Sequence, residues 1–459
     1  MKNIYNRRQL LRFISLLIGS SVLACSPKKS SVANQNKVLV IGAGISGLAA
    51  ARELKAKGIG VTILEGRSRL GGRVYTNNTL NNLPLDMGAS WIHGINGNPI
   101  YKLAQSGNIQ TLETDYDALE LYSNGKFLED KEQKIIDQRL ASILEATEKI
   151  SNRRETKNQE DVSLKSAIDQ VVAQRNFSAL QLQELNYAIN ATIEQEFAAD
   201  VANLSLYHWD TGDEVDGKDV LFPGGYGQIV DLLAQDLEIK LNQIVTKISY
   251  SNQGVTVTTN QGTFSAEKVV ITLPLGVLKK GVVEFSPPLP ASKINTINQL
   301  GMGVLNKLYL QFPEVFWDKK AHLLGYVTTN KGEWAEWLNI YRYTKQPILL
   351  GFNAGEYGRA IESLSDPEIV AKAMQNLRQM YGSQIPDPLG YLVTRWQQDP
   401  FSYGSYSYMA IGSTPQDRET LGETISDRLF FAGEATSQKY PSTVHGAFLS
   451  GVEVAKKIM

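Results

Sequence analysis

A glycine-rich turn between a predicted strand and a predicted helix is the first feature of the sequence that could do chemistry. Residues 37–41 are a short apolar run typical of a buried parallel strand, and a G-x-G-x-x-G spacing follows at the start of an alanine-rich helical pattern. The first glycine of this spacing makes a tight turn, the second lets backbone approach a phosphate, and the third lets the helix pack on the strand. A second strand pattern then ends at an acid, which can accept a hydrogen bond from a ribose hydroxyl. The pattern predicts a dinucleotide site with contacts from Gly42, Gly44, Ser46, Gly47 and Glu65.

A second pair of glycines favours FAD over NAD as the dinucleotide. The stretch 65–73, EGRSRLGGR, resembles the extended fingerprint of the glutathione-reductase-like FAD proteins. The resemblance implies that Arg73 neutralises the charge of the pyrophosphate and that Gly72 lets the loop run close to the cofactor. Arg67 is expected to contact the cofactor from the same stretch.

The composition indicates a soluble globular chain with two or three domains. At 459 residues the chain is too long for one simple core, and its 42% apolar and 20% charged residues are ordinary for a globular protein. Lys plus Arg total 46 against 47 Asp plus Glu, so the net charge favours no nucleic-acid partner. One Cys and four His exclude an internal disulfide and predict no metal site.

The N-terminal segment is predicted to be a targeting signal. Arg7 and Arg8 precede a short apolar run, as in a twin-arginine export signal, and the sequence VLAC that ends at Cys25 resembles a bacterial lipobox. We therefore expect a signal peptide at 1–25, a polar tether at 26–36, and an exported bacterial protein, periplasmic or anchored to a membrane through lipidated Cys25. The alternative is a plain signal peptide in which the cysteine is incidental.

Several ordered motifs between residues 36 and 459 resemble those of the flavin amine oxidases. They are Asp86–Gly94, Phe222–Gly227, Leu273–Leu278, Asn306–Leu308, Gly404–Tyr408 and Phe431–Ala447. On these motifs the chain is identified as a member of the monoamine/polyamine oxidase family, similar to the polyamine oxidases and to the catalytic domain of the histone lysine demethylases. The resemblance implies an α/β fold, in which a glutathione-reductase-like FAD-binding Rossmann domain is interleaved with an α+β substrate-binding domain.

The resemblance also places the domain boundaries. The FAD-binding domain is expected to comprise 37–92, 220–287 and 391–459, and the substrate-binding domain 93–219 and 288–390. Local patterns predict a helix over Ile136, Leu140, Ile143, Leu144 and Thr147, a strand over 305–312, and a strand, a turn and a strand over 255–272.

Three residues are expected to act on the substrate. The resemblance implies that Lys307 hydrogen-bonds through water to flavin N5. On a strand it shares a face with Leu305 and Tyr309, where an inward lysine is costly; the alternative is a lysine whose ammonium reaches solvent. Tyr406 and Tyr440 match the two positions of the family's aromatic sandwich around the amine.

Further residues are expected to hold the cofactor. The resemblance implies that Glu434 bonds the ribityl chain, and that a helix starting at Thr443 and Val444 is aimed at the flavin pyrimidine. Ser405 stands where the mitochondrial monoamine oxidases have the cysteine that binds flavin, so FAD is expected to be non-covalent. Other contacts are expected from Ala89, Ser90, Trp91, Val245 and Trp396.

The expected substrates are polyamines such as spermine and spermidine. His93 is like that of the animal polyamine oxidases, and Glu196 resembles an acid that binds a distal ammonium, although a solvated carboxylate on a helix is the alternative. The family's reaction transfers hydride to flavin N5; the imine hydrolyses to an aldehyde and a shorter amine, and O₂ reoxidises FAD to give H₂O₂.

Two other functions stay open. One is an L-amino-acid or aromatic monoamine oxidase or dehydrogenase, although no arginine clamp for a carboxylate is evident. The other is a flavoprotein-like binding module without turnover. The predicted export signal and the lack of a long helical insertion argue against histone demethylation, and the oligomeric state is not predicted.

Overall fold

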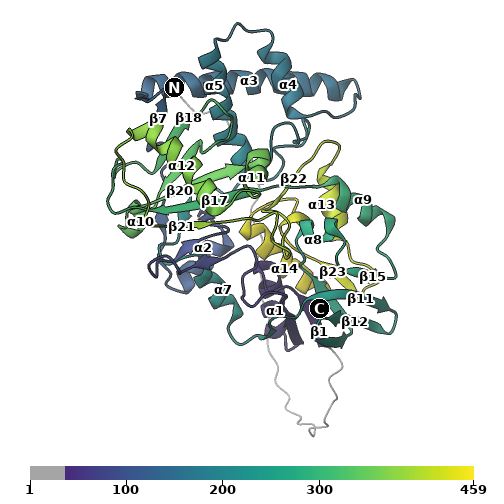
Figure 1. Cartoon of the computed structure of the whole chain (residues 1–459). Helices are drawn as coiled ribbons and strands as arrows, with labels where there is room; N and C mark the ends of the chain where they lie inside the picture. Colours follow the sequence, from purple (N-terminus) through teal and green to yellow (C-terminus); the bar gives the residue numbers. More distant parts are fainter. Residues whose placement is uncertain (1–36) are drawn as a thin grey trace, which may run out of the picture. The chain divides into compact units, whose positions relative to one another are not determined.

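Five parallel strands position the glycine-rich turn in the computed structural model, which describes residues 37–459 (Figure 1). In spatial order they are β10 (Glu238–Lys240), β2 (Gly60–Leu64), β1 (Lys37–Ile41), β14 (Lys268–Ile271) and β23 (Leu429–Phe431). Val38 and Val40 face one side of the sheet, and Leu39 and Ile41 face the other; all four are buried. A strand buried on both faces is what the continuous apolar run predicts.

The parallel sheet is the middle of three layers. Helices pack on the face of Val38 and Val40: α1 (Ile45–Ala56), α2 (Pro99–Ser106), α7 (Gly227–Ala234) and α14 (Val444–Ile458). A four-stranded sheet packs on the opposite face, in the order β13 (Gly262–Ala266), β12 (Gly254–Thr259), β11 (Val245–Ser251) and β15 (Glu284–Ser286).

The strands predicted near 255–258 and 269–272 are confirmed as β12 and β14, and the turn lies at Asn260 and Gln261. Between them the structure adds one strand that was not predicted, β13, which pairs with β12 across that turn. That later strand, β14, pairs with β1 and β23 in the parallel sheet. The short, exposed β13 lacks the apolar run by which β14 was recognised.

A seven-stranded sheet forms the second large unit of structure (Figure 1). Its order is β21 (Gly390–Val393), β17 (Leu305–Gln311), β20 (Ile348–Ala354), β19 (Glu336–Asn339), β18 (Leu323–Val327), β7 (Leu119–Ser123) and β8 (Lys126–Phe127). One face packs on helix α12 (Asp366–Tyr381). The other face contains Tyr309 and Phe352 and packs on Leu85, Met87 and Leu221.

The remaining elements are helices and the strands of three smaller sheets, β16 with β22, β3 with β4, and β5 with β9 and β6. The predicted helix near 136–147 is confirmed as α3, in which Ile136, Leu140, Ile143 and Thr147 are buried. The longer elements are α3 (Asp130–Thr156), α4 (Leu164–Val172), α5 (Ala179–Ile189), α8 (Leu275–Lys280), α9 (Ala291–Gln299), α11 (Gly355–Ile361) and α13 (Pro415–Gly422). The short ones are β3 (Thr76–Asn77), β4 (Leu85–Asp86), β5 (Trp91–Ile92), β6 (Leu112–Glu113), a π turn (Asn190–Glu194), α6 (Gln195–Phe197), β9 (Val220–Leu221), β16 (Gly301–Met302), α10 (Tyr341–Thr344), β22 (Ser407–Tyr408) and a 3-10 turn (Glu434–Thr436).

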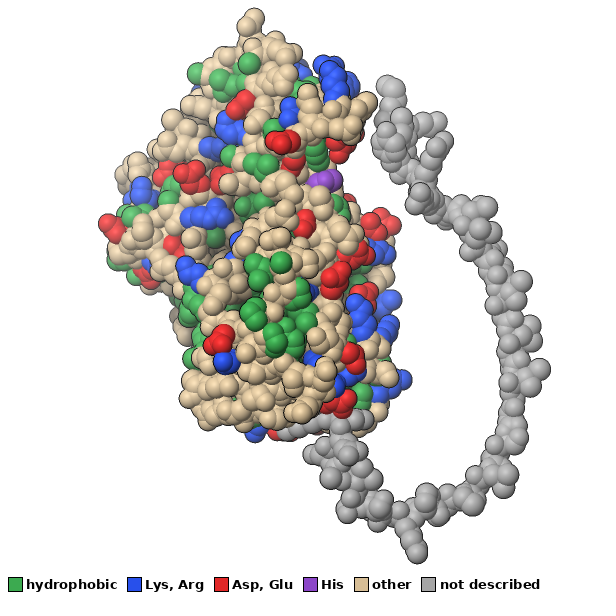
Figure 2. All heavy atoms as spheres, turned by 90° about the vertical axis from the view of Figure 1, so that its right-hand side faces the viewer, with side chains coloured by type: hydrophobic (Ala, Val, Ile, Leu, Met, Phe, Trp, Pro, Cys, Tyr) green, Lys and Arg blue, Asp and Glu red, His purple; other side chains and the backbone are tan. Residues whose placement is uncertain are grey.

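The α/β fold class is confirmed, whereas the domain boundaries stay a prediction because residues 37–459 form one compact unit. Figure 2 shows Lys and Arg interspersed with Asp and Glu on the face it draws. Among the described helices, none is long and apolar enough to cross a membrane.

Helices α1 and α14 touch at backbone distance. A Cβ added to Gly451 would lie 2.1 Å from the carbonyl oxygen of Ser46, so a side chain at 451 must push the two helices apart. Both helices cover the parallel sheet with buried side chains, and a shift would disturb that packing.

We expect Gly451→Ala to lower the free energy of unfolding by about 1–3 kcal/mol, because the added methyl group overpacks this contact. Denaturant unfolding followed by circular dichroism measures the change. Gly60→Ala is the matched control, since a Cβ at Gly60 has no atom within 4 Å, and it should leave stability unchanged. Equal stability of both variants would contradict the prediction.

Candidate active site

A cavity of about 930 Å³ lies where the parallel strands end. Gly42 follows β1, Glu65 follows β2, Thr272 follows β14 and Gly433 follows the end of β23, and all four line it. The carboxyl ends of parallel strands are the usual ligand-binding edge of such sheets. The cavity brings together 19 of the predicted site residues: Gly42, Gly44, Ser46, Glu65, Arg67, Gly72, Arg73, Ala89, Ser90, Trp91, His93, Glu196, Val245, Lys307, Trp396, Tyr406, Glu434, Thr443 and Val444.

The glycines of the turn divide into two kinds. Gly42 has φ +102°, and a Cβ on Gly47 would lie 2.0 Å from the carbonyl oxygen of Gly42, so the fold itself requires both. A Cβ on Gly44 would meet nothing closer than the carbonyl oxygen of Gly71, at 3.9 Å. The protein leaves space at Gly44, beside the start of α1 and in the cavity wall, which fits a bound pyrophosphate.

Glu65 and Arg67 are fixed at the end of β2. The Glu65 carboxylate accepts from the backbone N–H groups of Ala43 (2.7 Å) and Arg67 (2.8 Å), which ties the acid to the glycine-rich turn. Arg67 forms a bidentate pair with Asp399, with both N–O distances 2.8 Å. Binding of a ribose hydroxyl by Glu65 stays a prediction.

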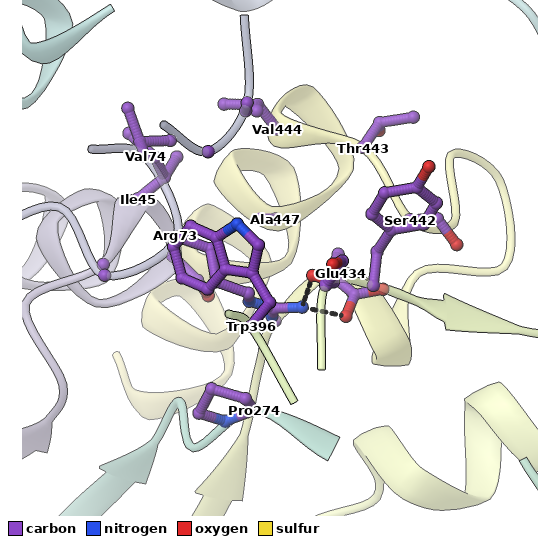
Figure 3. Close-up of a pocket in the computed structure, with 18 of the residues that line it drawn as sticks. Ile45, Arg73, Val74, Pro274, Trp396, Glu434, Ser442, Thr443, Val444 and Ala447 are labelled. Carbon is purple, nitrogen blue, oxygen red and sulfur yellow. Dashed lines mark hydrogen bonds and ion pairs between the residues drawn. The ribbon is translucent and has the colours of Figure 1, made fainter. Parts of the chain in front are cut away.

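Arg73, which is partly exposed, and Glu434, which is buried, form an ion pair in the cavity wall, 2.8 Å between Nη1 and Oε1 (Figure 3). Burial by itself raises the pKa of Glu434, but Arg73, the Ser407 hydroxyl and Arg418 outweigh burial and hold the pKa below its ordinary value. Burial also lowers the pKa of Arg418 to about 10. This pair places a permanent carboxylate and a guanidinium where the resemblance puts the ribityl chain and the pyrophosphate.

The amino end of α14 points its first residues into the cavity, next to Trp396 (Figure 3). Thr443 caps the helix, because its hydroxyl accepts from the N–H of Gly446 (3.0 Å), and Val444 and Ala447 line the cavity. The positive end of the helix dipole therefore faces the cavity. The Trp396 indole N–H is held by the carbonyl oxygen of Met87 (3.1 Å).

Lys307 is buried, with 4% of its surface exposed, and lines the cavity as predicted. Its ammonium donates to the carbonyl oxygens of Asp86 (2.8 Å) and Gly88 (2.6 Å) and to the hydroxyl of Ser90 (2.6 Å). Burial lowers the pKa of Lys307 to about 8, against the opposing effect of the Asp86 carboxylate. A water bridge from Lys307 to the flavin stays a prediction.

The predicted pair of tyrosines is not brought together in this cavity. Tyr406 lines it and donates to the carbonyl oxygen of Gln195 (2.6 Å). Tyr440 does not line the cavity. Its ring packs against the ring of His445, with the two ring centroids 4.8 Å apart. The next three residues, Pro441, Ser442 and Thr443, do line the cavity, and the role of Tyr440 beside the substrate stays a prediction.

An acidic side of the cavity surrounds His93. Its Nδ1 lies 2.8 Å from the Asp219 carboxylate, which also accepts from the Tyr116 hydroxyl (3.0 Å). Burial lowers the pKa of His93, but Asp219 and Glu196 outweigh burial and raise it above the ordinary value. His445, also in the wall, has a pKa lowered to about 4 by burial and by His93.

Sequence reasoning missed Asp219, Tyr116, Arg418 and Glu336, all of which line the cavity. None belongs to a recognisable motif, and only tertiary structure brings them to the site. Asp86, which opens a motif, was also passed over: it is buried, and burial raises its pKa to about 6. Among the described residues no group of His, Cys, Asp and Glu could hold a metal ion.

Comparison with known proteins identifies similar chains. The family model of flavin-containing amine oxidoreductases matches residues 45–459. Polyamine oxidase 4 of Oryza sativa subsp. japonica is 38% identical over 442 residues, covering 92% of this chain and 88% of the relative. Lysine-specific histone demethylase 1 homolog 1 of the same plant is 37% identical over 471 residues, or 97% of this chain and 55% of the relative. The human lysine-specific histone demethylase 2 is 34% identical, over 93% of this chain and 53% of the relative. The chain thus spans about half the length of these demethylases.

The predicted localisation is wrong. The relatives named above are plant and human proteins, and the demethylases among them align with more than nine-tenths of this chain, which does not support an exported bacterial lipoprotein. The predicted signal peptide, the tether and Cys25 lie outside the described residues, and attachment to a membrane is not supported.

We expect Gly44→Ala to weaken FAD binding by about 10-fold or more without loss of stability, because the new methyl group fills the space at the turn and clashes with no protein atom, the nearest being the carbonyl oxygen of Gly71 at 3.9 Å. Reconstitution of the apoprotein followed by flavin fluorescence gives the Kd. Gly47→Ala should instead destabilise the fold, since its Cβ overlaps the carbonyl oxygen of Gly42. Wild-type affinity in Gly44→Ala would contradict the assignment.

We expect Lys307→Met to slow flavin reduction or reoxidation about 100-fold or more while FAD stays bound. Stopped-flow absorbance measures both half-reactions. Lys293→Met is a matched control: Lys293 is also buried, donates to three carbonyl oxygens, and has a pKa lowered to about 8 by burial, but it does not line the cavity. Wild-type rates in both half-reactions of Lys307→Met would refute its predicted role.

Proposed function

The chain belongs to the family of flavin-containing amine oxidoreductases, and we propose that it oxidises polyamines such as spermine and spermidine. It is an FAD-dependent amine oxidase of the family whose relatives include polyamine oxidases. The glycine-rich turn, Arg73 and Glu434 would hold FAD, which would supply the acceptor for the hydride from the carbon beside the amine nitrogen, with O₂ as the proposed final electron acceptor.

The observation that supports polyamines is the set of carboxylates in the cavity wall. Away from Glu65 and Glu434 the wall contains Glu196, Asp210, Asp213, Glu214, Asp219 and Glu336. Asp219 pairs with His93, and Asp213 lies 3.8 Å from Lys439. The other four form no ion pair within the described chain, so each of them that is ionised adds negative charge to this side of the cavity, and that charge attracts a polycation.

The arginines of the cavity do not favour an amino acid as substrate. Arg67 is held by Asp399, Arg73 by Glu434, and Arg418 by the Ser407 hydroxyl and the carbonyl oxygen of Ala435. All three lie with the glycine-rich turn or with Glu434, on the side expected to hold the cofactor. A carboxylate clamp would need a free guanidinium on the acidic side, and the wall has none among the described residues.

The chain's own residues have distinct parts in the proposed reaction. The carboxylates hold the charged amino groups that do not react, and the ring of Tyr406 limits the space beside the reacting amine. Lys307, whose pKa is lowered to about 8 by burial, can hold or release a proton at Nζ near neutral pH. Trp396, Leu323 and Phe352 make the rest of the wall largely apolar, which excludes water.

The substrate test is anaerobic bleaching of the flavin by spermine, spermidine, tyramine, L-amino acids and a methyl-lysine histone peptide. We expect fast bleaching by the two polyamines only. The apparent second-order rate constant of flavin reduction should fall as salt is added, because the acidic wall attracts a polycation. The peptide is included because the demethylase relatives are as similar to this chain as the polyamine oxidases are.

Each outcome of that test is decisive. Bleaching by the peptide alone would move the chain to the substrate class named by its demethylase relatives, and bleaching by tyramine or amino acids alone would move it to monoamines. A flavoprotein that no amine reduces would contradict amine oxidation altogether.

A further inference from the structure

Glu336 lies on the same face of the seven-stranded sheet as Lys307. The residue paired with Lys307 in the next strand is Phe352, and the residue paired with Phe352 in the strand after that is Glu336. Directly paired residues of neighbouring strands place their side chains on one face. Two strand spacings separate Lys307 from Glu336, or about 10 Å. Both residues line the cavity.

The surroundings of Glu336 give its carboxylate no structural purpose. Its neighbours on this face are apolar, with Leu323, Leu338 and Phe352 in the buried core, and no described residue forms an ion pair or a hydrogen bond with it. A leucine would suit these neighbours better, because an unpaired carboxyl group in such a place costs free energy. The carboxylate of Glu336 is therefore suited to bind a ligand that enters the cavity.

Two tyrosines are the titratable groups that interact with Glu336. Tyr116 lies on the side of Asp219 and Glu196, and Tyr187, from helix α5, lies beside Gly325, the residue paired with Glu336 in β18. The Tyr187 hydroxyl is buried without a hydrogen-bond partner, and neither tyrosine supplies positive charge. Burial, with no cation to oppose it, raises the pKa of Glu336 to about 7.

We propose that Glu336 is a specificity-determining residue that binds an amino group of the substrate other than the one being oxidised. The proposal rests on the proposed function, because only a substrate with a second amine can use it. With the reacting amine near Lys307, the methylene spacer of a polyamine extends along Phe352 and brings its next amino group toward Glu336. The ammonium then holds the carboxyl group in its ionised form, and a carboxyl group that was protonated releases its proton to solvent.

The test compares two substrates with one skeleton in the wild type and in Glu336→Gln. One is spermidine; the other is N-propylbutan-1-amine, which is spermidine without its two primary amino groups. We expect Glu336→Gln to raise KM for spermidine about 10-fold at about pH 8, with kcat little changed, and to leave KM for the monoamine unaltered. At about pH 6 the difference should shrink, because the wild-type carboxyl group is then mostly protonated and resembles the amide.

Two further variants secure the result. Glu336→Leu suits the apolar neighbours and should raise KM for spermidine as Glu336→Gln does, so a folding defect of one variant does not decide the matter. Glu419→Gln removes an exposed carboxylate on α13 outside the cavity wall and should change neither substrate. No change with spermidine, or an equal change with both substrates, would overturn the proposal for Glu336. A wild type that oxidises neither substrate would instead overturn the proposed function.

Discussion

A lysine ammonium that is buried must find an acceptor for each of its protons, and Lys307 finds all three in residues 86–90. These residues include the end of β4, whereas Lys307 belongs to β17 of the large sheet. The side chain of Asp86 is held in turn by the Thr76 hydroxyl (2.5 Å) and the N–H of Tyr226 (2.9 Å). This buried cation, together with the Tyr309 hydroxyl that donates to the Asp86 carbonyl oxygen (2.8 Å), ties the seven-stranded sheet to the segments that follow the glycine-rich turn.

The two sides of the cavity differ in net charge, and the net charge of each side depends on which of its ionised groups are paired. On the side of the glycine-rich turn, every arginine in the wall has an acceptor and Glu434 has a cation, so local charges are balanced before any ligand binds. On the other side, four carboxylates have no cation. A dinucleotide and the polycationic substrate that we propose would therefore meet surfaces suited to different chemistry within one cavity.

What the sequence could predict depended on whether the signal was local. The strand, turn and helix from residue 37 to 56 are consecutive, so spacing alone indicated Gly42, Gly44 and Gly47. Lys307 could be expected from its motif and from strand alternation. Glu336 could not, because its position beside Phe352 depends on the pairing of three strands. Tyr440 was expected from its motif alone, and its place beside the substrate stays a prediction, because it is not among the residues that line the cavity. The prediction of localisation was wrong because an arginine pair and an apolar run are short and nonspecific sequence signals.

The order of strands in the parallel sheet has a consequence for synthesis of the protein. The sheet takes β1 and β2 from the first segment, β10 and β14 from the middle, and β23 from residues 429–431, while α14 covers it from residue 444 onward. Contacts between residues so far apart in sequence form slowly and cannot form while the chain is incomplete. The glycine-rich turn is among the first described parts to leave the ribosome, yet Glu434 and the capped end of α14 are among the last. A nascent chain therefore has to wait, with its first strands unpaired on one side, until nearly the whole polypeptide has been made before it can retain a cofactor.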